Sequence, residues 1–186
     1  MEQPLDVPEV AVRGGRALRP WRLSDLPLVQ EASQDDYIPL ITTVPSPCSE
    51  ADGLAFIERQ WSRATTRAGY TFVVVESDGR PVGQVGLWLR DVAQGRASLG
   101  YWVVASARGR GTARAAVEAV SDWASGTLEI PRLELWVEPG NTASVRTAEG
   151  AGFAREGLLR SWQQIGGERK DMLMYARIND GLGGGR

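Results

Sequence analysis

The stretch from Tyr101 to Ala113 combines an apolar run, a turn broken by glycines and the start of an alanine-rich segment. Its turn consists of Arg108, Gly109, Arg110, Gly111, Thr112 and Ala113. Glycines let the backbone approach a ligand closely, and the free amides at a helix start attract anions. A tight connection would explain the same glycines, so phosphate binding and a plain turn are equally open. The glycine patterns typical of ATP-binding and NAD-binding loops are absent, which leaves another diphosphate as the candidate ligand.

A second group of polar residues follows the alternating segment Arg132–Glu138. Side chains alternate between the two faces of a strand, so Glu134 and Glu138 share one face of this segment. Beyond them, Asn141 and Ser144 begin a short predicted helix that glycines near Phe153 can end. An asparagine cap with a glycine stop explains this helix without any ligand.

The composition excludes several classes of function. The chain has no histidine, which rules out histidine triads and histidine-ligated metal sites, and we expect no metal. A net charge of -2 gives no reason to expect nucleic acid as a partner. Cys48 is the single cysteine, the start does not resemble a signal peptide, and no apolar run could cross a bilayer. We therefore expect a cytoplasmic protein without a membrane partner.

The predicted elements alternate in a way that favours a mixed α/β fold. Residues 1–14 read as a flexible arm, 15–179 as a single domain, and 180–186 as a flexible tail. Strands are predicted at 16–22, 70–76, 81–89, 96–104, 132–138, 154–159 and 169–178. Helices are predicted after Ser24, from the Ser49–Asp52 capping box to about 67, after the glycine turn, and at 141–149, with 37–48 as a loop. One strand–helix–strand crossover is expected to be parallel.

The two motifs, in this order and at this spacing, resemble the GNAT superfamily of N-acetyltransferases. The resemblance rests on Arg108-x-x-Gly111-x-Ala113, on Asn141 with Ser144, and on Ala151-Gly152-Phe153. It extends from Arg16 to Ile178 and is closest to ribosomal-protein N-terminal alanine and serine acetyltransferases. Further similar segments are Leu18-Arg19-Pro20, Gly83–Gly86, Leu99–Val103, Arg155-Glu156-Gly157 and Asp171–Tyr175. The helix from Asn141 departs from the family because it lacks the tyrosine that many members use as an acid.

This resemblance implies a mostly antiparallel sheet flanked by helices, with a splayed parallel strand pair that holds acetyl-CoA as co-substrate. The expected acceptor is a primary amine, either on a protein N-terminus or on a small molecule. The turn residues 108–113 would bind the pyrophosphate. Trp102, Val103 and Val104 would pair with the pantetheine arm, and the amide of Val103 or Val104 would polarise the thioester carbonyl. Asn141 would contact the arm, and Ser144 would lie near the sulfur.

Attack by an amine requires a base, and without histidine the candidates are carboxylates or tyrosine. We favour Glu138, which is nearest the strand end, over Glu134, although an ordinary ion pair would explain either residue. Ser144 could protonate the departing thiolate, with Tyr101 as a weaker alternative. Acidic residues at 35–36 and Tyr37 could attract a cationic acceptor. The tryptophans considered for the cleft wall are Trp21, Trp61, Trp88 and Trp162.

A different class of function stays open at this stage. The same fold could serve as a non-catalytic acyl-CoA sensor or interaction domain, which would bind CoA without turning over any amine. Oligomeric state is also open, and a homodimer is one expectation.

Overall fold

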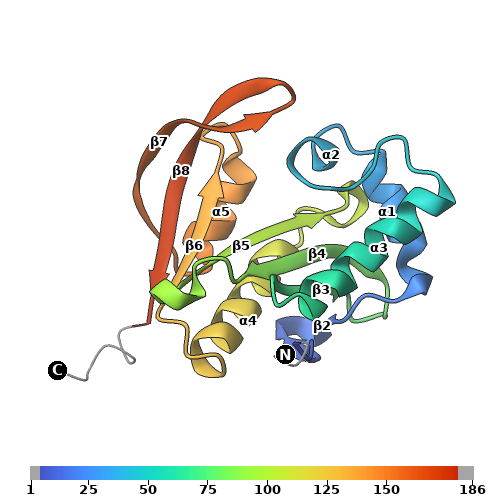
Figure 1. Ribbon diagram of the computed structural model, residues 1–186, viewed down its shortest axis with the longest axis horizontal. Helices are drawn as coiled ribbons and strands as arrows, with labels where there is room; N and C mark the ends of the chain where they lie inside the picture. The colour runs from blue at the N-terminus through green and yellow to red at the C-terminus, as the bar shows by residue number, and fades with distance from the viewer. Residues whose placement is uncertain (1–4, 180–186) are drawn as a thin grey trace.

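The computed structural model describes residues 5–179, which form one eight-stranded sheet in the order β1-β2-β3-β4-β5-β6-β8-β7 (Figure 1). The strands are β1 (Val10–Val12), β2 (Arg16–Arg19), β3 (Gly69–Val75), β4 (Pro81–Trp88), β5 (Arg96–Val103), β6 (Arg132–Val137), β7 (Ala154–Ile165) and β8 (Glu168–Ile178). The helices are α1 (Leu26–Ser33), α2 (Ile38–Ile41), α3 (Glu50–Thr65), α4 (Thr112–Gly126) and α5 (Thr142–Gly150). Among these residues no helix is long and apolar enough to cross a membrane.

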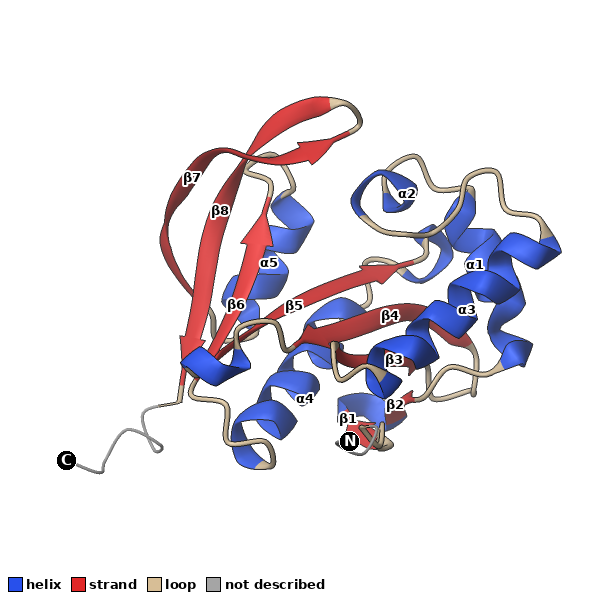
Figure 2. Cartoon of the chain, in the orientation of Figure 1, coloured by secondary structure: helices blue, strands red, loops and turns tan. Residues whose placement is uncertain are grey.

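Helices cover both faces of the sheet (Figure 2). On one face of β3, the Thr71 hydroxyl donates a 3.4 Å hydrogen bond to the Gln60 carbonyl of α3. On the other face, the ring of Tyr70 packs edge-on against Trp123 of α4, with centroids 4.8 Å apart. Because neighbouring residues of a strand point to opposite faces, these contacts place α3 and α4 on opposite sides of the sheet.

The sheet divides between β5 and β6. These two strands are parallel and pair only from Arg96 with Arg132 to Ser98 with Glu134. The other neighbouring strands are antiparallel. Beyond Ser98 the two strands separate, and Figure 1 shows β6, β8 and β7 turning away from β1–β5. The predicted parallel crossover, mostly antiparallel sheet and splayed strand pair are confirmed.

The helix α3 begins where its sequence predicts. The Ser49 hydroxyl accepts the Asp52 amide at 3.2 Å, and the Asp52 carboxylate accepts the Ser49 amide at 3.2 Å. This reciprocal capping box satisfies two amides that a helix start leaves without partners.

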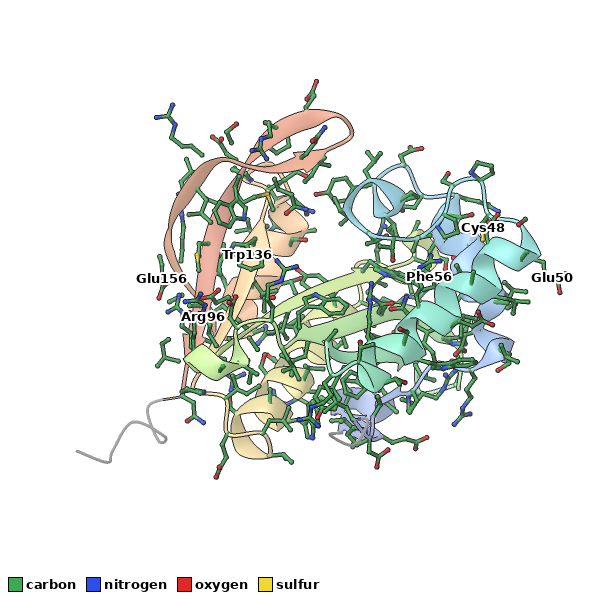
Figure 3. All side chains as sticks on the ribbon, in the orientation of Figure 1. Cys48, Glu50, Phe56, Arg96, Trp136 and Glu156 are labelled. Carbon is green, nitrogen blue, oxygen red and sulfur yellow. The ribbon has the colours of Figure 1, made fainter. Side chains whose placement is uncertain are left out.

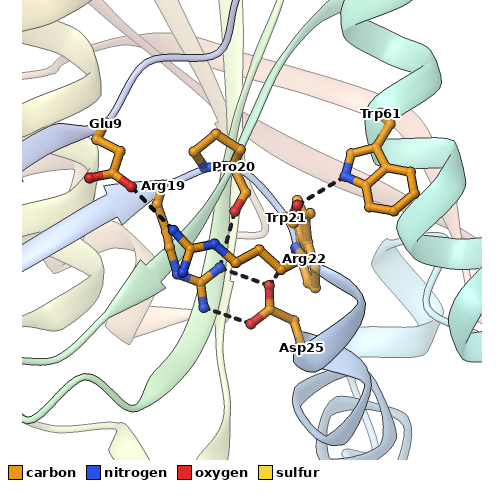
Figure 4. A network of polar contacts seen from close by, with 7 residues as sticks. All are labelled: Glu9, Arg19, Pro20, Trp21, Arg22, Asp25 and Trp61. Carbon is orange, nitrogen blue, oxygen red and sulfur yellow. Dashed lines mark hydrogen bonds and ion pairs between the residues drawn. The ribbon is translucent and has the colours of Figure 1, made fainter.

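The structure corrects the start of α1. The helix begins at Leu26, and the turn before it is organised by Asp25 rather than by Ser24. The Asp25 carboxylate is 1% exposed and accepts two bonds from Arg19, at 2.7 and 2.8 Å, and one from the Arg22 amide (Figure 4). In the same view, the Trp61 indole of α3 donates to the Trp21 carbonyl at 2.9 Å.

Three further sequence predictions are corrected. Residues 10–12 are not part of a flexible arm but form β1, because pairing with β2 satisfies their backbone groups. Residues 1–4 and the predicted tail 180–186 lie outside the described residues. The predicted loop 37–48 contains the single turn α2, since the Asp35 carboxylate accepts the amides of Tyr37 and Ile38 at 3.0 Å. Strand β7 continues to Ile165 past an irregular register that hides its alternation.

Candidate active site

Two cavities meet at the edge of β5 where it leaves β6. The first, here called the sheet cavity, has a volume of about 510 Å³ and lies among β4, β5, β6, α2 and α3. The second, the loop cavity, has a volume of about 600 Å³ and is bounded by the glycine turn and α5. Residues that line both are Tyr37, Ile41, Tyr101, Trp102, Asn141 and Ser144. A molecule that fills the loop cavity can therefore present one end to the sheet cavity.

The glycine turn opens the loop cavity onto the start of α4. Gly109 and Gly111 have φ values of +77° and +73°, in the left-handed region that favours glycine. Gly111 is the N-cap of α4, and it lines the cavity with Thr112 and Ala113. The first free amides of a 15-residue helix thus lie at the wall of the cavity, which suits a bound phosphate.

The side chains of the glycine turn offer less to a ligand in the loop cavity than its backbone amides do. The Thr112 hydroxyl donates to Glu76 at 2.6 Å, and Thr112 is 2% exposed, so this side chain braces the turn. Arg110 lines neither cavity, although sequence analysis placed it with the pyrophosphate residues. Its carbonyl accepts a 3.3 Å hydrogen bond from Arg16 instead.

The Arg108 guanidinium is bound within the protein by a backbone carbonyl and a carboxylate. Its Nε donates to the Val103 carbonyl at 2.8 Å, and its Nη2 lies 2.6 Å from the Asp35 carboxylate. Burial opposes ionisation of Asp35, but hydrogen bonds from the Ile38 and Tyr37 amides and from Arg108 outweigh it and lower the pKa of Asp35. Arg108 therefore ties the glycine turn to the segment that carries Tyr37.

Strand pairing distinguishes the amides of Val103 and Val104. The Val104 amide donates to the Val82 carbonyl of β4 at 3.0 Å and is not available to a ligand. In an antiparallel ladder the next residue's N–H points to the opposite side, so the Val103 amide faces the gap left by β6. Of the two amides considered from sequence, the structure rules out Val104 as an oxyanion donor.

Asn141 and Ser144 lie at the junction of the two cavities. The Asn141 side chain accepts the Ser144 amide at 3.0 Å and caps α5. The Ser144 carbonyl lies 3.4 Å from the hydroxyl of Tyr101. Burial raises the pKa of Tyr101, so this phenol keeps its proton at neutral pH. Both hydroxyl-bearing residues, Tyr101 and Ser144, thus line the junction of the two cavities.

Glu138 lines the sheet cavity just beyond the end of β6 and accepts a short hydrogen bond from the Tyr37 hydroxyl. Burial and the neighbouring Glu138 carboxylate raise the pKa of Tyr37 to about 12. The sequence indicates Tyr37 only as part of an acidic segment that could attract a cationic acceptor. The only sequence signal for Tyr37 is a phenol in a stretch broken by prolines. No residue near Tyr37 in the sequence indicates Glu138 as its partner.

Glu134, the other candidate base, is not brought to the site. It lines neither cavity, is 6% exposed and forms a 2.7 Å ion pair with Arg132. Hydrogen bonds from Arg132 to Glu156 and to Glu134 raise the pKa of the arginine. Glu134 does not reach either cavity because β6 is still paired with β5 and β8 at this residue, so no cleft exists there.

The sheet cavity is mostly apolar and aromatic. Figure 3 shows Phe56 of α3 and Trp136 of β6, two of its lining residues, on opposite sides of it. Of the tryptophans proposed from sequence only Trp88 lines this cavity, joined by Trp102 and Trp136. The other three are accounted for elsewhere, with Trp21 in the core, Trp61 bonded to the Trp21 carbonyl and Trp162 51% exposed beside Trp136.

Comparisons with known proteins agree with this geometry. The model of the acetyltransferase (GNAT) domain matches residues 16–154. The chain is 32% identical over 109 residues to N-acetyltransferase p20 of Bacillus licheniformis, itself uncharacterized, covering 59% of this chain and 61% of that protein. The match thus spans about three fifths of that curated relative's length.

Solved structures extend the likeness to nearly the whole chain. Mycobacterium smegmatis RimJ, solved with CoA-disulfide, superposes with a TM-score of 0.84 at 27% identity, covering 97% of this chain and 92% of RimJ. A ribosomal-protein-S5-alanine acetyltransferase from Vibrio fischeri has the same fold, with a TM-score of 0.75 at 19% identity over 89% of this chain and 94% of its own. The glycine turn, the divided sheet and the matching domain model together show that the chain belongs to the GNAT acetyltransferase family.

Proposed function

We propose that this protein is an acetyl-CoA-dependent N-acetyltransferase whose acceptor is a primary amine. One observation carries the proposal: the loop cavity, which is lined by the start of α4 and by Val103, adjoins the sheet cavity that contains the Glu138 carboxylate. RimJ was solved with CoA-disulfide, which supports the same class of ligand for the loop cavity.

The loop cavity fits the proposed co-substrate. Amides at Gly111–Ala113 would hold the pyrophosphate, and Asn141 and Ser144 would lie along the pantetheine arm. When bound, acetyl-CoA supplies an acetyl group activated as a thioester. The Val103 amide would donate to the oxyanion that develops on the thioester carbonyl, while Trp102 shields it from water.

The sheet cavity would hold the amine. Glu138 would accept the proton that the attacking nitrogen loses, and the Tyr37 hydroxyl would keep the carboxylate in place. Ser144, or Tyr101 behind it, would return a proton to the departing thiolate.

A ribosomal-protein-S5-alanine acetyltransferase is similar in structure to this chain over most of its length, which favours a protein as acceptor over a small amine. A cytoplasmic location and a homodimer remain predictions from the sequence.

The test combines calorimetric titration of acetyl-CoA with thiol release over a panel of peptides and small amines. We expect binding, and release with one class of amine. Ala113→Glu should abolish binding because Ala113 lines the loop cavity, whereas Thr127→Glu, which adds the same charge beyond the other end of α4, should not. Binding without release from any amine would favour the sensor function, and no binding by the wild type would refute the proposal.

A further inference from the structure

The sheet cavity contains a cation as well as a carboxylate. Among the residues that line this cavity, Glu138 is the one acidic residue and Arg63, on α3, is the one basic residue. Glu138 is bonded to Tyr37, which also lines the loop cavity, whereas Arg63 lines the sheet cavity alone. The two charges therefore lie at different ends of the cavity, with the carboxylate at the end where transfer would occur.

Arg63 has no carboxylate partner among residues 5–179. Its Nη1 donates to the Gln60 side chain at 2.8 Å, and its guanidinium stacks 4.3 Å from the centre of the Trp88 ring. The side chain is half-buried, and burial together with the neighbouring Arg59 lowers its pKa. A partly desolvated guanidinium beside a second cation is stabilised by an anion, which no residue of the described part of the chain provides.

The wall between the two ends has buried polar atoms without partners. Gln84 is 6% exposed and Trp102 is 4% exposed, and both line the sheet cavity. The Gln84 Oε1 and the Trp102 Nε1 have no hydrogen-bond partner among the described residues. Buried polar groups are nearly always paired, so a ligand with polar groups along its length would supply the partners that this acceptor and this donor lack among the described residues.

Strand geometry gives the separation between the reacting end and Arg63. A Cβ on Gly100 would lie 3.4 Å from the Trp88 Nε1, so the ring under the guanidinium packs beside Gly100. Gly100 is three residues from Val103 along β5, and a strand rises about 3.3 Å per residue. An anion on Arg63 would thus be about 10 Å from the thioester carbonyl. An extended peptide covers this distance with two to three residues.

We propose that the acceptor is an amine that carries an anionic group about two to three residue lengths away, bound by Arg63 while Gln84 and Trp102 bind the polar groups between. This inference rests on the proposed function, because it names the substrate class of the same site. It predicts that charge at a set distance from the amine, rather than the amine alone, determines which acceptors are used.

The experiment compares alanyl peptides of one to four residues, each as the free acid and as the C-terminal amide. At two or three residues we expect the free acid to have a kcat/KM roughly 10- to 100-fold higher, the effect of a charge-assisted hydrogen bond. The preference should be small at one residue, where the carboxylate cannot reach Arg63. Equal use of acids and amides at every length would overturn the inference.

Variants connect the preference to Arg63. Arg63→Gln should remove the preference for the free acid over the amide, and Arg63→Lys should keep part of this preference. An unchanged acetyl-CoA affinity would show that each variant is folded. Arg22→Gln, at an exposed arginine that lines neither cavity, should leave the preference unchanged. A preference that survives in Arg63→Gln would overturn the inference. Thiol release from no amine would instead refute the proposed function itself, and the inference would fail with it.

Discussion

The Tyr37 hydroxyl donates a hydrogen bond to Oε1 of Glu138, from a residue 101 positions earlier in the chain. With its pKa raised to about 12, Tyr37 remains a donor across the neutral range. Because Glu138 also lines the sheet cavity, this pair supports our proposal that its carboxylate accepts a proton.

Removing the charge of Glu138 tests this role. Glu138→Gln keeps the shape and the bond from Tyr37 but cannot accept a proton, so kcat/KM should fall about 10²- to 10⁴-fold. Acetyl-CoA affinity, measured by calorimetry, should not change because Glu138 does not line the loop cavity. Normal turnover throughout the neutral range would remove Glu138 from the mechanism.

The matched substitution at Glu134 should have the opposite profile. Glu134→Gln weakens the buried pair with Arg132, so the free energy of unfolding should fall by about 1–3 kcal/mol. Turnover should stay at the wild-type level, since Glu134 lies outside both cavities. Urea denaturation and thiol release measure the two effects, and a large loss of turnover in a stable variant would restore Glu134 as a candidate base.

Proline substitution distinguishes the roles of the Val103 and Val104 amides at the end of β5. Val103→Pro removes an N–H that faces the gap, so no ladder bond is lost and kcat should fall about 10²- to 10³-fold. Val104→Pro removes the bond to Val82 and should lower Tm instead. Thermal melts and steady-state rates of both variants make the comparison. A folded Val103→Pro enzyme with an undiminished rate would exclude this amide as the oxyanion donor.

The ion pair between Asp35 and Arg108 should make stability depend on pH in the acid range. Because the folded-state pKa of Asp35 is lowered, its contribution is fully present above the ordinary value of 3.8 and is lost as pH falls through the folded-state pKa. Asp35→Asn should therefore lower the free energy of unfolding by about 1 kcal/mol at neutral pH. That difference should vanish at the acid end of a urea-denaturation series, and a constant difference at all pH values would contradict the assignment.

Local signals in the sequence determined most elements of the fold. The Ser49–Asp52 capping box, the glycine turn before α4 and the alternation in β6 each depend on residues within a few positions of one another. Short-range hydrogen bonds and side-chain periodicity decide such features, so they can be read without the fold. The same is true of the order of the two motifs, which identified the family.

The tertiary structure alone decided which candidate residues meet at the cavities. Whether Glu134 or Glu138 meets a cavity depends on where β5 and β6 separate, and whether Val103 or Val104 is unpaired depends on the register with β4. The contact between Tyr37 and Glu138 depends on how α2 folds over the sheet. Register, splay and packing are set by long-range pairing, on which the local sequence carries no information.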